Sequence, residues 1–348
     1  MEKYFIAFII AVTIAYFLTP YAIKLAHRIG AIDVPKDNRR VHNKPIPRLG
    51  GSAIYIAFVI TALIMMPIDR ELIALLIGAT MIVLMGMYDD VKPVSAKFKL
   101  LIQIIASFVV IFGGVRIEAF RQVPLGIFSI PVTIFWIVGI TNAVNLIDGL
   151  DGLAAGVAII ASISLAFVSF TNSVSGMMEV ALLLIILAGS ALGFLPYNFN
   201  PAKIFMGDTG SLLIGFLLSV ISIEGIIKSA TTIVITIPLL ALGVPVLDTA
   251  FAIARRLINK RPIMEADKGH LHHRLLDQGL SQRQTVLILY FISSLLGASA
   301  VFISDANKAT AYLALGAIML VILYGALKLG MMKKTPEAEN PALSNKSL

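Results

Sequence analysis

The sequence contains no cysteine, and only 14% of its 348 residues are charged. The absence of cysteine excludes a disulfide framework and thiol chemistry. Soluble domains are about one quarter charged, so the scarcity of charge excludes an ordinary soluble domain. Neither a Walker A sequence nor a GxGxxG fingerprint occurs, and an ATP-binding or dinucleotide-binding fold therefore has no support.

Apolar residues, in contrast, are abundant and arranged in long blocks. They make up 58% of the chain, whose mean hydropathy is +0.91. Apolar windows of roughly 18 residues or more are typical of helices that span a membrane. The first block is too long for a signal peptide and no small-residue cleavage site follows it, so we expect it to be retained. The sequence therefore predicts an all-α polytopic membrane protein with ten or eleven spans, near residues 4–26, 51–67, 71–88, 99–114, 130–145, 153–171, 177–195, 210–228, 231–254, 285–303 and 309–328.

The distribution of basic residues predicts how these spans are oriented. Of the 28 Lys and Arg residues, 22 fall on one side of the predicted topology and 6 on the other. Basic loops face the cytoplasm, which puts the N-terminus outside and the C-terminus inside. Contact of these loops with anionic lipid explains the net charge of +8 without nucleic acid. We expect one membrane domain over residues 1–330 and a polar, disordered cytoplasmic tail over 331–348.

The predicted ninth span contains Pro238, Gly243 and Pro245, followed by Asp248. Proline inside a helix removes a hydrogen bond and kinks the helix. We expect a bent span whose lower half leans away and opens a lipid groove beside the site. The alternative is a kink that the fold tolerates and that has no function.

Acidic residues and histidines share the predicted cytoplasmic face. Acids near the membrane plane are costly and are functional hypotheses by default, although each has a structural alternative. Asp208 is a candidate helix N-cap, and Asp89-Asp90 are candidates for a solvated loop pair. Asn145, Asp148 and Asp151 are spaced by three, which on a helix follows one slanted face, and the glycines among them allow close packing against a neighbour.

Carboxylates and an amide at a polar–apolar boundary favour a hard divalent cation. Magnesium is held by one or two carboxylates together with substrate phosphates, whereas zinc would favour a closed set of His and Cys. The HLHH sequence supplies His270, His272 and His273, but basic residues flank it, so it suits phosphate better than metal. The small residues of FMGDTGS offer free N–H groups at a helix start, where a phosphate can bind. The pattern predicts a cytoplasmic magnesium–phosphate site at membrane depth.

Five motifs in a fixed order make a resemblance specific: GMYDD, NAVNLIDGLDGLAAG, PYNFNPAKIFMGDTGS, PVLDTAFAIARR and GHLHHRLLDQGLSQRQTV. Together they resemble the polyprenyl-phosphate N-acetylhexosamine-1-phosphate transferase family over nearly the whole chain, excluding the tail. The HLHH form resembles the branch that uses UDP-N-acetylglucosamine. The phospho-N-acetylmuramoyl-pentapeptide branch usually has three consecutive histidines, a run that Leu271 interrupts here.

The resemblance implies an activity and a set of partners. Undecaprenyl phosphate would attack the sugar-linked phosphate of a UDP-N-acetylhexosamine, releasing UMP and forming a lipid pyrophosphoryl sugar for the cell envelope. The resemblance implies Mg2+ as cofactor, with Mn2+ as a substitute, a multi-pass location in the bacterial inner membrane, and a homodimer as a further expectation. Direct attack and a phosphosugar intermediate on an Asp both stay open. We favour direct attack because a phosphate monoester, whose second pKa is about 6, is already largely deprotonated at pH 7.

The resemblance also implies roles for individual residues. Those matching catalytic positions are Asp89, Asp90 and Asp148. Those matching metal-binding positions are Asn145 and Asp208. Those matching substrate-binding positions are Lys99, Asp151, Asn198, Phe205, His270, His272 and His273. Gln103, one turn from Lys99 on the fourth predicted span, also matches the pattern, and Lys99 is expected to contact a phosphate or an Asp. Lys44 and Arg48 are weaker candidates.

Two function classes compete with the transferase. An ion- or proton-coupled transporter would place its acids near the bilayer midplane in paired, broken helices, whereas only Asp248 is a candidate for such depth here. A non-enzymatic scaffold would not require Asn145, Asp148, Asp151 and Asp208 together. Formation of a lipid-linked sugar from a UDP-sugar distinguishes the transferase from both.

Overall fold

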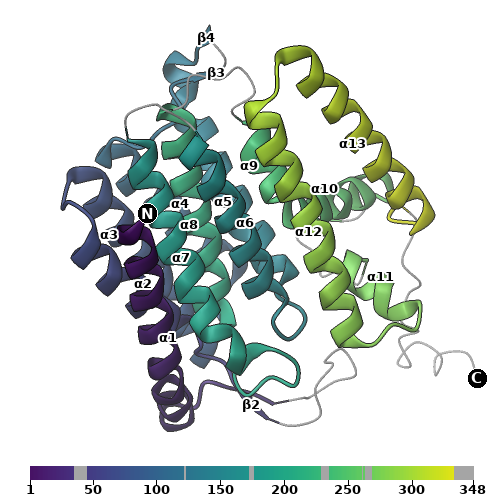
Figure 1. The fold of residues 1–348 in the computed structure, drawn as a ribbon. Helices are drawn as coiled ribbons and strands as arrows, with labels where there is room; N and C mark the ends of the chain where they lie inside the picture. Colours follow the sequence, from purple (N-terminus) through teal and green to yellow (C-terminus); the bar gives the residue numbers. More distant parts are fainter. Residues whose placement is uncertain are drawn as a thin grey trace, which may run out of the picture.

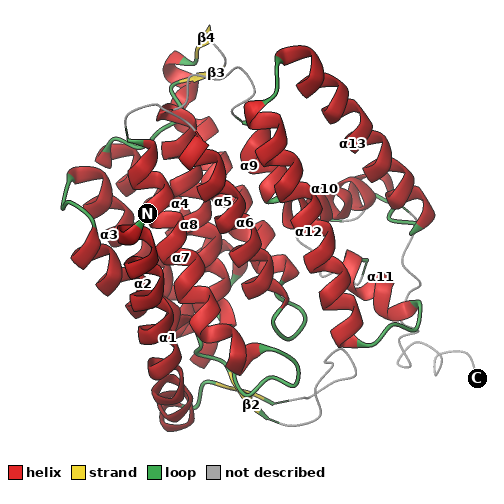
Figure 2. Cartoon of the chain, viewed as in Figure 1, coloured by secondary structure: helices red, strands yellow, loops and turns green. Residues whose placement is uncertain are grey.

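The computed structural model describes residues 1–34, 45–120, 123–171, 176–228, 235–260, 262 and 269–332 (Figure 1). Helices dominate this part of the chain, and the strands form two short antiparallel pairs (Figure 2). The helices are α1 (Glu2–Ile29), α2 (Gly51–Met65), α3 (Arg70–Val91), α4 (Ala96–Gly113), α5 (Ser129–Ile147), α6 (Leu153–Thr171), α7 (Met177–Asn198), α8 (Gly207–Lys228), α9 (Thr236–Ala241), α10 (Gly243–Ile258), α11 (Leu271–Asp277), α12 (Gln282–Asp305) and α13 (Lys308–Lys328), with the 3-10 turn η1 (Gly126–Phe128). The strands are β1 (Ile32–Asp33), β2 (Ile46–Pro47), β3 (Ala119–Phe120) and β4 (Val123–Pro124).

Nine of the described helices are long and apolar enough to cross a membrane. The apolar helix α2 is shorter, with 15 residues. An all-α polytopic membrane protein is therefore the architecture of this chain, whereas the total of eleven spans and the position of the termini stay predictions. The polar segment 333–348 lies outside the described residues, and Met331 just before it is buried.

The predicted ninth span consists of two helices rather than one. Helix α9 ends at Ala241, α10 begins at Gly243, and Leu242 lies between them. Pro245 lies in the first turn of α10, where the missing N–H of proline is tolerated. In Figure 1, α10 lies across the direction of the long helix α12. Whether this arrangement opens a lipid groove stays a prediction.

Polar caps set where several helices begin. The side chains of Asp69, Ser95 and Asn307 accept hydrogen bonds from backbone N–H groups in the first turns of α3, α4 and α13. Ser281 and Gln284 form a capping box at the start of α12. Such caps satisfy N–H groups that have no partner within the helix.

Three helices approach one another closely at the end of the bundle that carries the acids. A Cβ atom on Gly51 of α2 would lie 2.1 Å from the Gly210 nitrogen in α8, and one on Gly86 of α3 would lie 2.6 Å from Thr209. Glycine is therefore required at both contacts. The start of α8 is held against α2 and α3, which brings Asp89 and Asp90, at the end of α3, to Asp208.

Candidate active site

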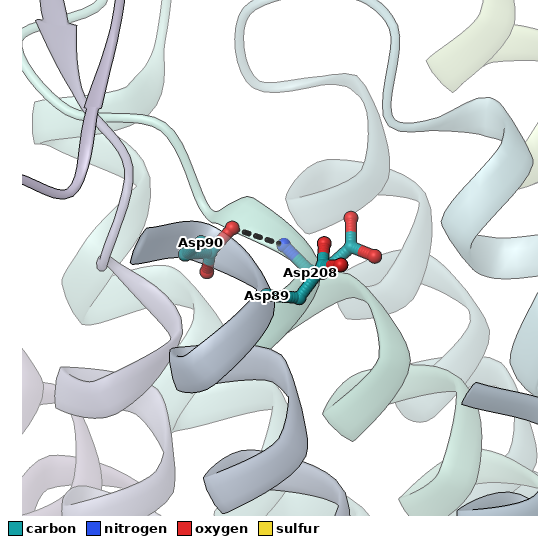
Figure 3. A group of neighbouring side chains, drawn as sticks. All are labelled: Asp89, Asp90 and Asp208. Atoms are coloured by element: carbon teal, nitrogen blue, oxygen red, sulfur yellow. Dashed lines mark hydrogen bonds between the residues drawn. The ribbon is translucent and has the colours of Figure 1, made fainter. Parts of the chain in front are cut away.

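Asp90 caps helix α8 from a neighbouring helix. Its Oδ1 accepts from the backbone N–H of Asp208 at 3.1 Å, and its Oδ2 accepts from the N–H and hydroxyl of Thr209 at 3.1 and 2.6 Å. The Arg48 guanidinium donates to Oδ1 at 3.1 Å, and the Asp90 side chain is 0% exposed. Figure 3 shows the Asp90 carboxylate turned toward the backbone of Asp208. Asp90 therefore fixes the start of α8, whereas Asp208, the N-cap candidate of the sequence, is the second residue of α8.

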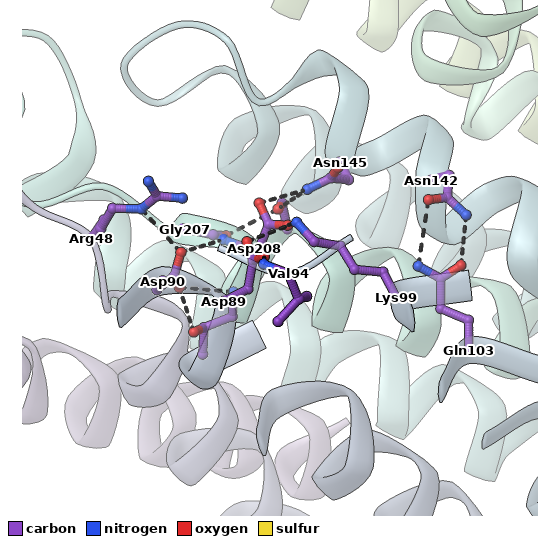
Figure 4. A network of polar contacts seen from close by, with 12 residues as sticks. Arg48, Asp89, Asp90, Val94, Lys99, Gln103, Asn142, Asn145, Gly207 and Asp208 are labelled. Carbon is purple, nitrogen blue, oxygen red and sulfur yellow. Dashed lines mark hydrogen bonds and ion pairs between the residues drawn. The ribbon is translucent and has the colours of Figure 1, made fainter. Parts of the chain in front are cut away.

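Lys99 joins the other two acids of this cluster. Its Nζ lies 2.7 Å from Asp89 Oδ2 and 2.5 Å from Asp208 Oδ2. The second oxygen of Asp89 accepts from the backbone N–H of Val94 at 2.8 Å. Figure 4 shows the lysine, which comes from α4, reaching between carboxylates that come from α3 and α8. Of the two partners expected for Lys99, a phosphate or an Asp, the structure contains the acids.

Helix α5 supplies an amide to the same cluster. Asn145 donates its Nδ2 to Asp208 Oδ1 at 3.3 Å and to Ser211 Oγ at 2.8 Å, so its carbonyl oxygen is the atom that it can offer to a ligand. One helical turn earlier, Asn142 pairs with Gln103 of α4 through two amide hydrogen bonds (Figure 4). The Gln103 side chain is thus engaged between helices.

The expected helical face of Asn145, Asp148 and Asp151 is only partly correct. Helix α5 ends at Ile147, and Asp148 to Gly152 form the turn that leads into α6. Gly152 has a φ of +79°, a conformation that glycine adopts readily and other residues rarely. The chain turns here because of its glycines, and all three polar side chains still line one cavity.

That cavity has a volume of about 360 Å³, within the range of small-molecule sites. It is lined by helix ends and loops rather than by the middle of the bundle. Its lining residues are Asp33, Arg48, Asn145, Asp148, Gly149, Leu150, Asp151, Asn198, Phe205, Gly207, Asp208, His273 and Gln282.

A second polar network supports the opposite wall of the cavity. Asp151 Oδ2 accepts from Asn200 Nδ2 at 2.9 Å and from the backbone N–H of Ala202 at 3.0 Å. The Asn200 amide also donates to Gln282 Oε1 at 2.9 Å, which connects this wall to the start of α12. Asp151 is therefore a bridge between two loops as well as a lining residue.

Asn198 lines the cavity but is engaged at both ends of its amide. Its Oδ1 accepts from the Gly152 N–H at 3.1 Å, and its Nδ2 donates to the Ile204 carbonyl at 3.0 Å. Its side chain is buried. Asn198 therefore holds the turn of Gly152 against the loop of Phe205, and its contact with a nucleotide stays a prediction.

The three predicted histidines occupy different places. His273 lines the cavity. His270 is buried, and its Nδ1 lies 2.7 Å from Asp248 Oδ2. His272 is buried against Gly149, where an added Cβ would lie 2.5 Å from its Nε2. Burial, reinforced by the charge of His273, lowers the pKa of His272 to about 3, so His272 is neutral at physiological pH.

Asp248 organises the histidine segment from α10. Besides His270, it accepts the backbone N–H of Leu271 at 2.7 Å and so caps α11. The Asp248 side chain is 1% exposed. It therefore acts as a support for α11 rather than as an isolated acid in the bilayer.

If the sugar nucleotide that the resemblance implies binds in this cavity, we expect Asp248→Asn to raise its KM about tenfold with a smaller change in kcat. The amide keeps the size of the side chain but loses the charge-assisted bonds that hold α11, which costs about 1–3 kcal/mol. Steady-state kinetics check this, with Asp277→Asn on the exposed face of α11 as the matched control. A fall in kcat at constant KM would contradict the positioning role.

Two of the basic residues that flank the HLHH sequence, Arg255 and Arg274, are directed at the end of α13. Arg255 donates its Nη1 to the Met331 carbonyl at 2.6 Å, and Arg274 donates its Nη1 to the Leu329 carbonyl at 3.4 Å. These contacts secure the end of α13 against α10 and α11. Lys44, Arg261 and residues 263–268 lie outside the described residues.

The charge of the cavity is strongly negative. Burial, together with the charges of Asp208 and Asp90, raises the pKa of the Asp148 carboxyl to about 7. Six acidic side chains (Asp33, Asp89, Asp90, Asp148, Asp151 and Asp208) lie in or beside the cavity, and Arg48 and Lys99 pair with three of them. A phosphorylated ligand would be repelled unless further positive charge entered with it.

This charge predicts a pH-dependent stability in the presence of a chelator. The folded-state pKa of Asp148 lies above the ordinary value near 4, so folding favours the protonated form. Its contribution to stability is present below about pH 4 and is lost as the pH rises to about 7. Relative to Asp148→Asn, we expect the wild-type Tm to fall by roughly 3–6 °C between pH 5 and 8, and Mg2+ to reverse the fall. If Tm depended on pH in the same way in the wild type and in Asp148→Asn, the raised pKa of Asp148 would be contradicted.

The side chains present fit a divalent cation. Ligand oxygens of Asp89, Asp90 and Asp208 lie within 4.8 Å of one another. Asp90 is saturated by its four donors, whereas Asp89 and Asp208 share the ammonium of Lys99, and Asn145 offers its carbonyl oxygen. A cation held by all-oxygen ligands is the chemistry of magnesium or manganese.

The structure adds three residues that the sequence reasoning missed. Asp33 and Gln282 line the cavity, and Thr209 pairs with Asp90. Gln282 lies in the recognised motif GLSQRQTV, which was the available signal. Thr209 likewise lies in the motif PYNFNPAKIFMGDTGS, whereas Asp33 lies outside the five motifs, in the polar segment between the first two predicted spans.

This protein is thus a helical membrane protein with a polar, acid-lined cavity at one end of its bundle, where several helices end. The family model described as glycosyl transferase family 4 matches residues 72–226. The chain is 42% identical to the probable undecaprenyl-phosphate N-acetylglucosaminyl 1-phosphate transferase of Bacillus subtilis, over 93% of this chain and 90% of that protein. It is 35% identical to the decaprenyl-phosphate N-acetylglucosaminephosphotransferase of Mycobacterium leprae, with 89% and 86% covered. It is 30% identical to the undecaprenyl-phosphate alpha-N-acetylglucosaminyl 1-phosphate transferase of Thermotoga maritima, with 83% and 88% covered.

The chain therefore belongs to the glycosyl transferase family 4, the polyprenyl-phosphate N-acetylhexosamine-1-phosphate transferases. This confirms the resemblance that the five motifs indicated.

Proposed function

We propose that this protein transfers N-acetylglucosamine 1-phosphate from UDP-N-acetylglucosamine to undecaprenyl phosphate, releasing UMP. The observation that carries the proposal is the cluster of Asp89, Asp208, Asn145 and Lys99, which four different helices bring together at the edge of a cavity that Asn145 and Asp208 line. Two similar proteins are named as transferases that act on undecaprenyl or decaprenyl phosphate with N-acetylglucosamine phosphate, and these names support the two substrates proposed.

Magnesium would be held by Asp89, Asp208 and Asn145. When bound, it would neutralise phosphate charge, which is the main requirement of phosphoryl transfer. Asp90 would not act on a substrate. Both of its oxygens already accept hydrogen bonds, so it would hold Asp208 and Arg48 in place.

The nucleotide sugar would occupy the cavity between Asp208 and His273. Phe205 would stack on the uracil, and Asp151 and Asn198 would support the wall against it. Lys99 would release one acid and contact a phosphate oxygen as the charges rearrange. His272, which is neutral, would donate or accept a hydrogen bond rather than supply charge.

The acceptor phosphate would need little help from a base. Its second pKa is about 6, so most of it is ionised at pH 7. Asp148, whose pKa is about 7, is able to take up the remaining proton. Direct attack on the sugar-linked phosphate then forms the new phosphorus–oxygen bond, while the bond to UMP breaks and UMP leaves with the electron pair.

The proposal places the cavity at the cytoplasmic face of the bacterial inner membrane, with the N-terminus outside. Eleven spans result if α2 and the α9–α10 pair each count as one. Sugar nucleotides are water-soluble, so a site open to the cytoplasm meets them directly, while the polyprenyl chain remains in the bilayer. A homodimer remains part of the proposal.

The broken ninth span leads to a test of acceptor binding. We expect Pro245→Ala to lower the apparent affinity for undecaprenyl phosphate about three- to tenfold, because alanine restores a donor and favours a continuous helix through Leu242. Acceptor titrations at saturating sugar nucleotide check this. Pro196→Ala in α7, another proline within a helix, is the control. An unchanged affinity would remove the main support for a groove at α9–α10.

A panel of sugar nucleotides tests the proposal itself. Purified protein, Mg2+ and undecaprenyl phosphate are incubated with UDP-N-acetylglucosamine, UDP-N-acetylgalactosamine or UDP-N-acetylmuramoyl-pentapeptide, and the lipid product is identified by mass spectrometry. We expect N-acetylglucosamine to react fastest. Product from the pentapeptide alone would replace the proposal by its nearest alternative.

A further inference from the structure

A second, larger cavity lies on the membrane-facing side of the bundle, away from the acids. Its volume is about 560 Å³, and α1, α2 and α3 form its walls. Leu18, Ile56 and Leu84 represent its apolar lining, and Ile56 and Leu84 are exposed. Tyr55 and Thr80 form a hydrogen bond of 2.7 Å in its wall. We refer to this cavity as the α1–α3 groove.

One end of the α1–α3 groove is cationic. Lys24 and Arg28 line it from the last two turns of α1, whereas Leu18 and Tyr21 line it one to two turns earlier. These positions are spaced by three and four residues and so follow one stripe of the helix. The Lys24 Nζ lies 5.5 Å from the centre of the Tyr21 ring. No acidic residue is among the described residues that line the groove.

The α1–α3 groove is separate from the cavity of the active site. The two share no lining residue within the described part of the chain. A buried cluster of Ala26, Ala31 and Leu49 has Met87, a lining residue of the groove, packed against it. Leu49 lies in the chain between Arg48, which lines the active-site cavity, and Ser52, which lines the groove.

We propose that the α1–α3 groove is a binding site for an anionic phospholipid of the surrounding membrane. The acyl chains of the lipid would lie along the apolar walls of the groove, and the lipid phosphate would lie between Lys24 and Arg28. Three features favour this occupant: the concave apolar surface, the cations at only one end, and the separation from the active site, which argues against the acceptor of the transfer reaction. The proposal does not depend on that reaction.

Photolabelling in nanodiscs tests the proposal. A phosphatidylglycerol with a photoreactive acyl chain is added to protein in phosphatidylcholine nanodiscs, and labelled peptides are mapped by mass spectrometry. We expect label on residues 18–28 and 52–56, with competition by phosphatidylglycerol and not by phosphatidylcholine. In Lys24→Gln/Arg28→Gln, half-maximal labelling should require about 30-fold more probe, since each basic residue contributes roughly fivefold.

Matched variants make the result decisive. Lys92→Gln/Lys97→Gln removes two exposed cations, one at the end of α3 and one in the first turn of α4, and should label like wild type. Ile56→Trp narrows the groove at an exposed position without altering charge and should also lose the label, which guards against misfolding of the first variant. Equal labelling of the two charge variants, or equal competition by phosphatidylcholine, would overturn the proposal. Displacement by undecaprenyl phosphate at lower concentration than phosphatidylglycerol would assign the groove to the acceptor instead.

Discussion

Asp208→Asn is expected to reduce kcat by about a thousandfold, close to complete loss, without preventing folding. Asp208 contacts Lys99 through one oxygen and Asn145 through the other, and it is 18% exposed to the cavity. Asparagine preserves the shape but removes the charge that attracts a divalent cation. Loss of an electrostatic group of this kind costs about 4 kcal/mol in the transition state.

The measurement is product formation over a range of Mg2+ concentrations. Asp277→Asn, which removes an exposed acid on the same end of the molecule, should leave activity unchanged. Recovery of the Asp208→Asn variant at high Mg2+ would reduce Asp208 to a peripheral role, because a ligand essential to the transition state cannot be replaced by concentration alone.

Asp90→Asn should have its largest effect on stability. Its carboxylate accepts four hydrogen bonds, from Arg48, the Asp208 N–H and two donors of Thr209. An amide presents a donor where one of these donors now lies, and it removes the negative charge that pairs with Arg48. Breaking such a pair costs about 3 kcal/mol, which lowers Tm by roughly 5–10 °C and releases the start of α8.

Asp89→Asn is the matched comparison, since Asp89 is the adjacent acid on the same helix and is also buried. It contacts Lys99 and the Val94 N–H but caps no neighbouring helix. We expect it to lower activity strongly and Tm by only a few degrees. If Asp90→Asn kept the wild-type Tm and lost activity as Asp89→Asn does, Asp90 would act on the substrate.

The sequence was sufficient to predict the helices, because a membrane requires long apolar blocks. The α6 and α13 boundaries agree with the predicted spans within one residue. At the ninth span two prolines and a glycine indicated a bend, and the sequence did not distinguish a bent helix from the helix break that lies at Leu242. The predicted spans 130–145 and 153–171 do leave a connection where the turn after Ile147 lies, but the spacing of the acids by three fits a helix as well as a turn rich in glycine.

Pairwise contacts within the site could not be derived from residue spacing. The motifs brought Asp89, Asp90 and Asp208 together as candidates, and the structure groups them. Motif order does not reveal that Asp90 caps α8 or that Lys99 bridges the other two acids. These facts depend on close packing at Gly51 and Gly86, which places backbone N–H groups of α8 against α3. The separation of His270 from His273 likewise arises from Asp248, on a different helix.

The central claim is a divalent-cation-dependent transfer from a UDP-sugar to a polyprenyl phosphate. The most direct measurement quantifies UMP and lipid-linked sugar from one reaction of purified protein, before chelation, after it, and after Mg2+ is returned. The account predicts equal amounts of the two products, their loss with chelator, and their return with Mg2+. Undiminished product in excess chelator, or UMP release without lipid-linked sugar, would contradict it.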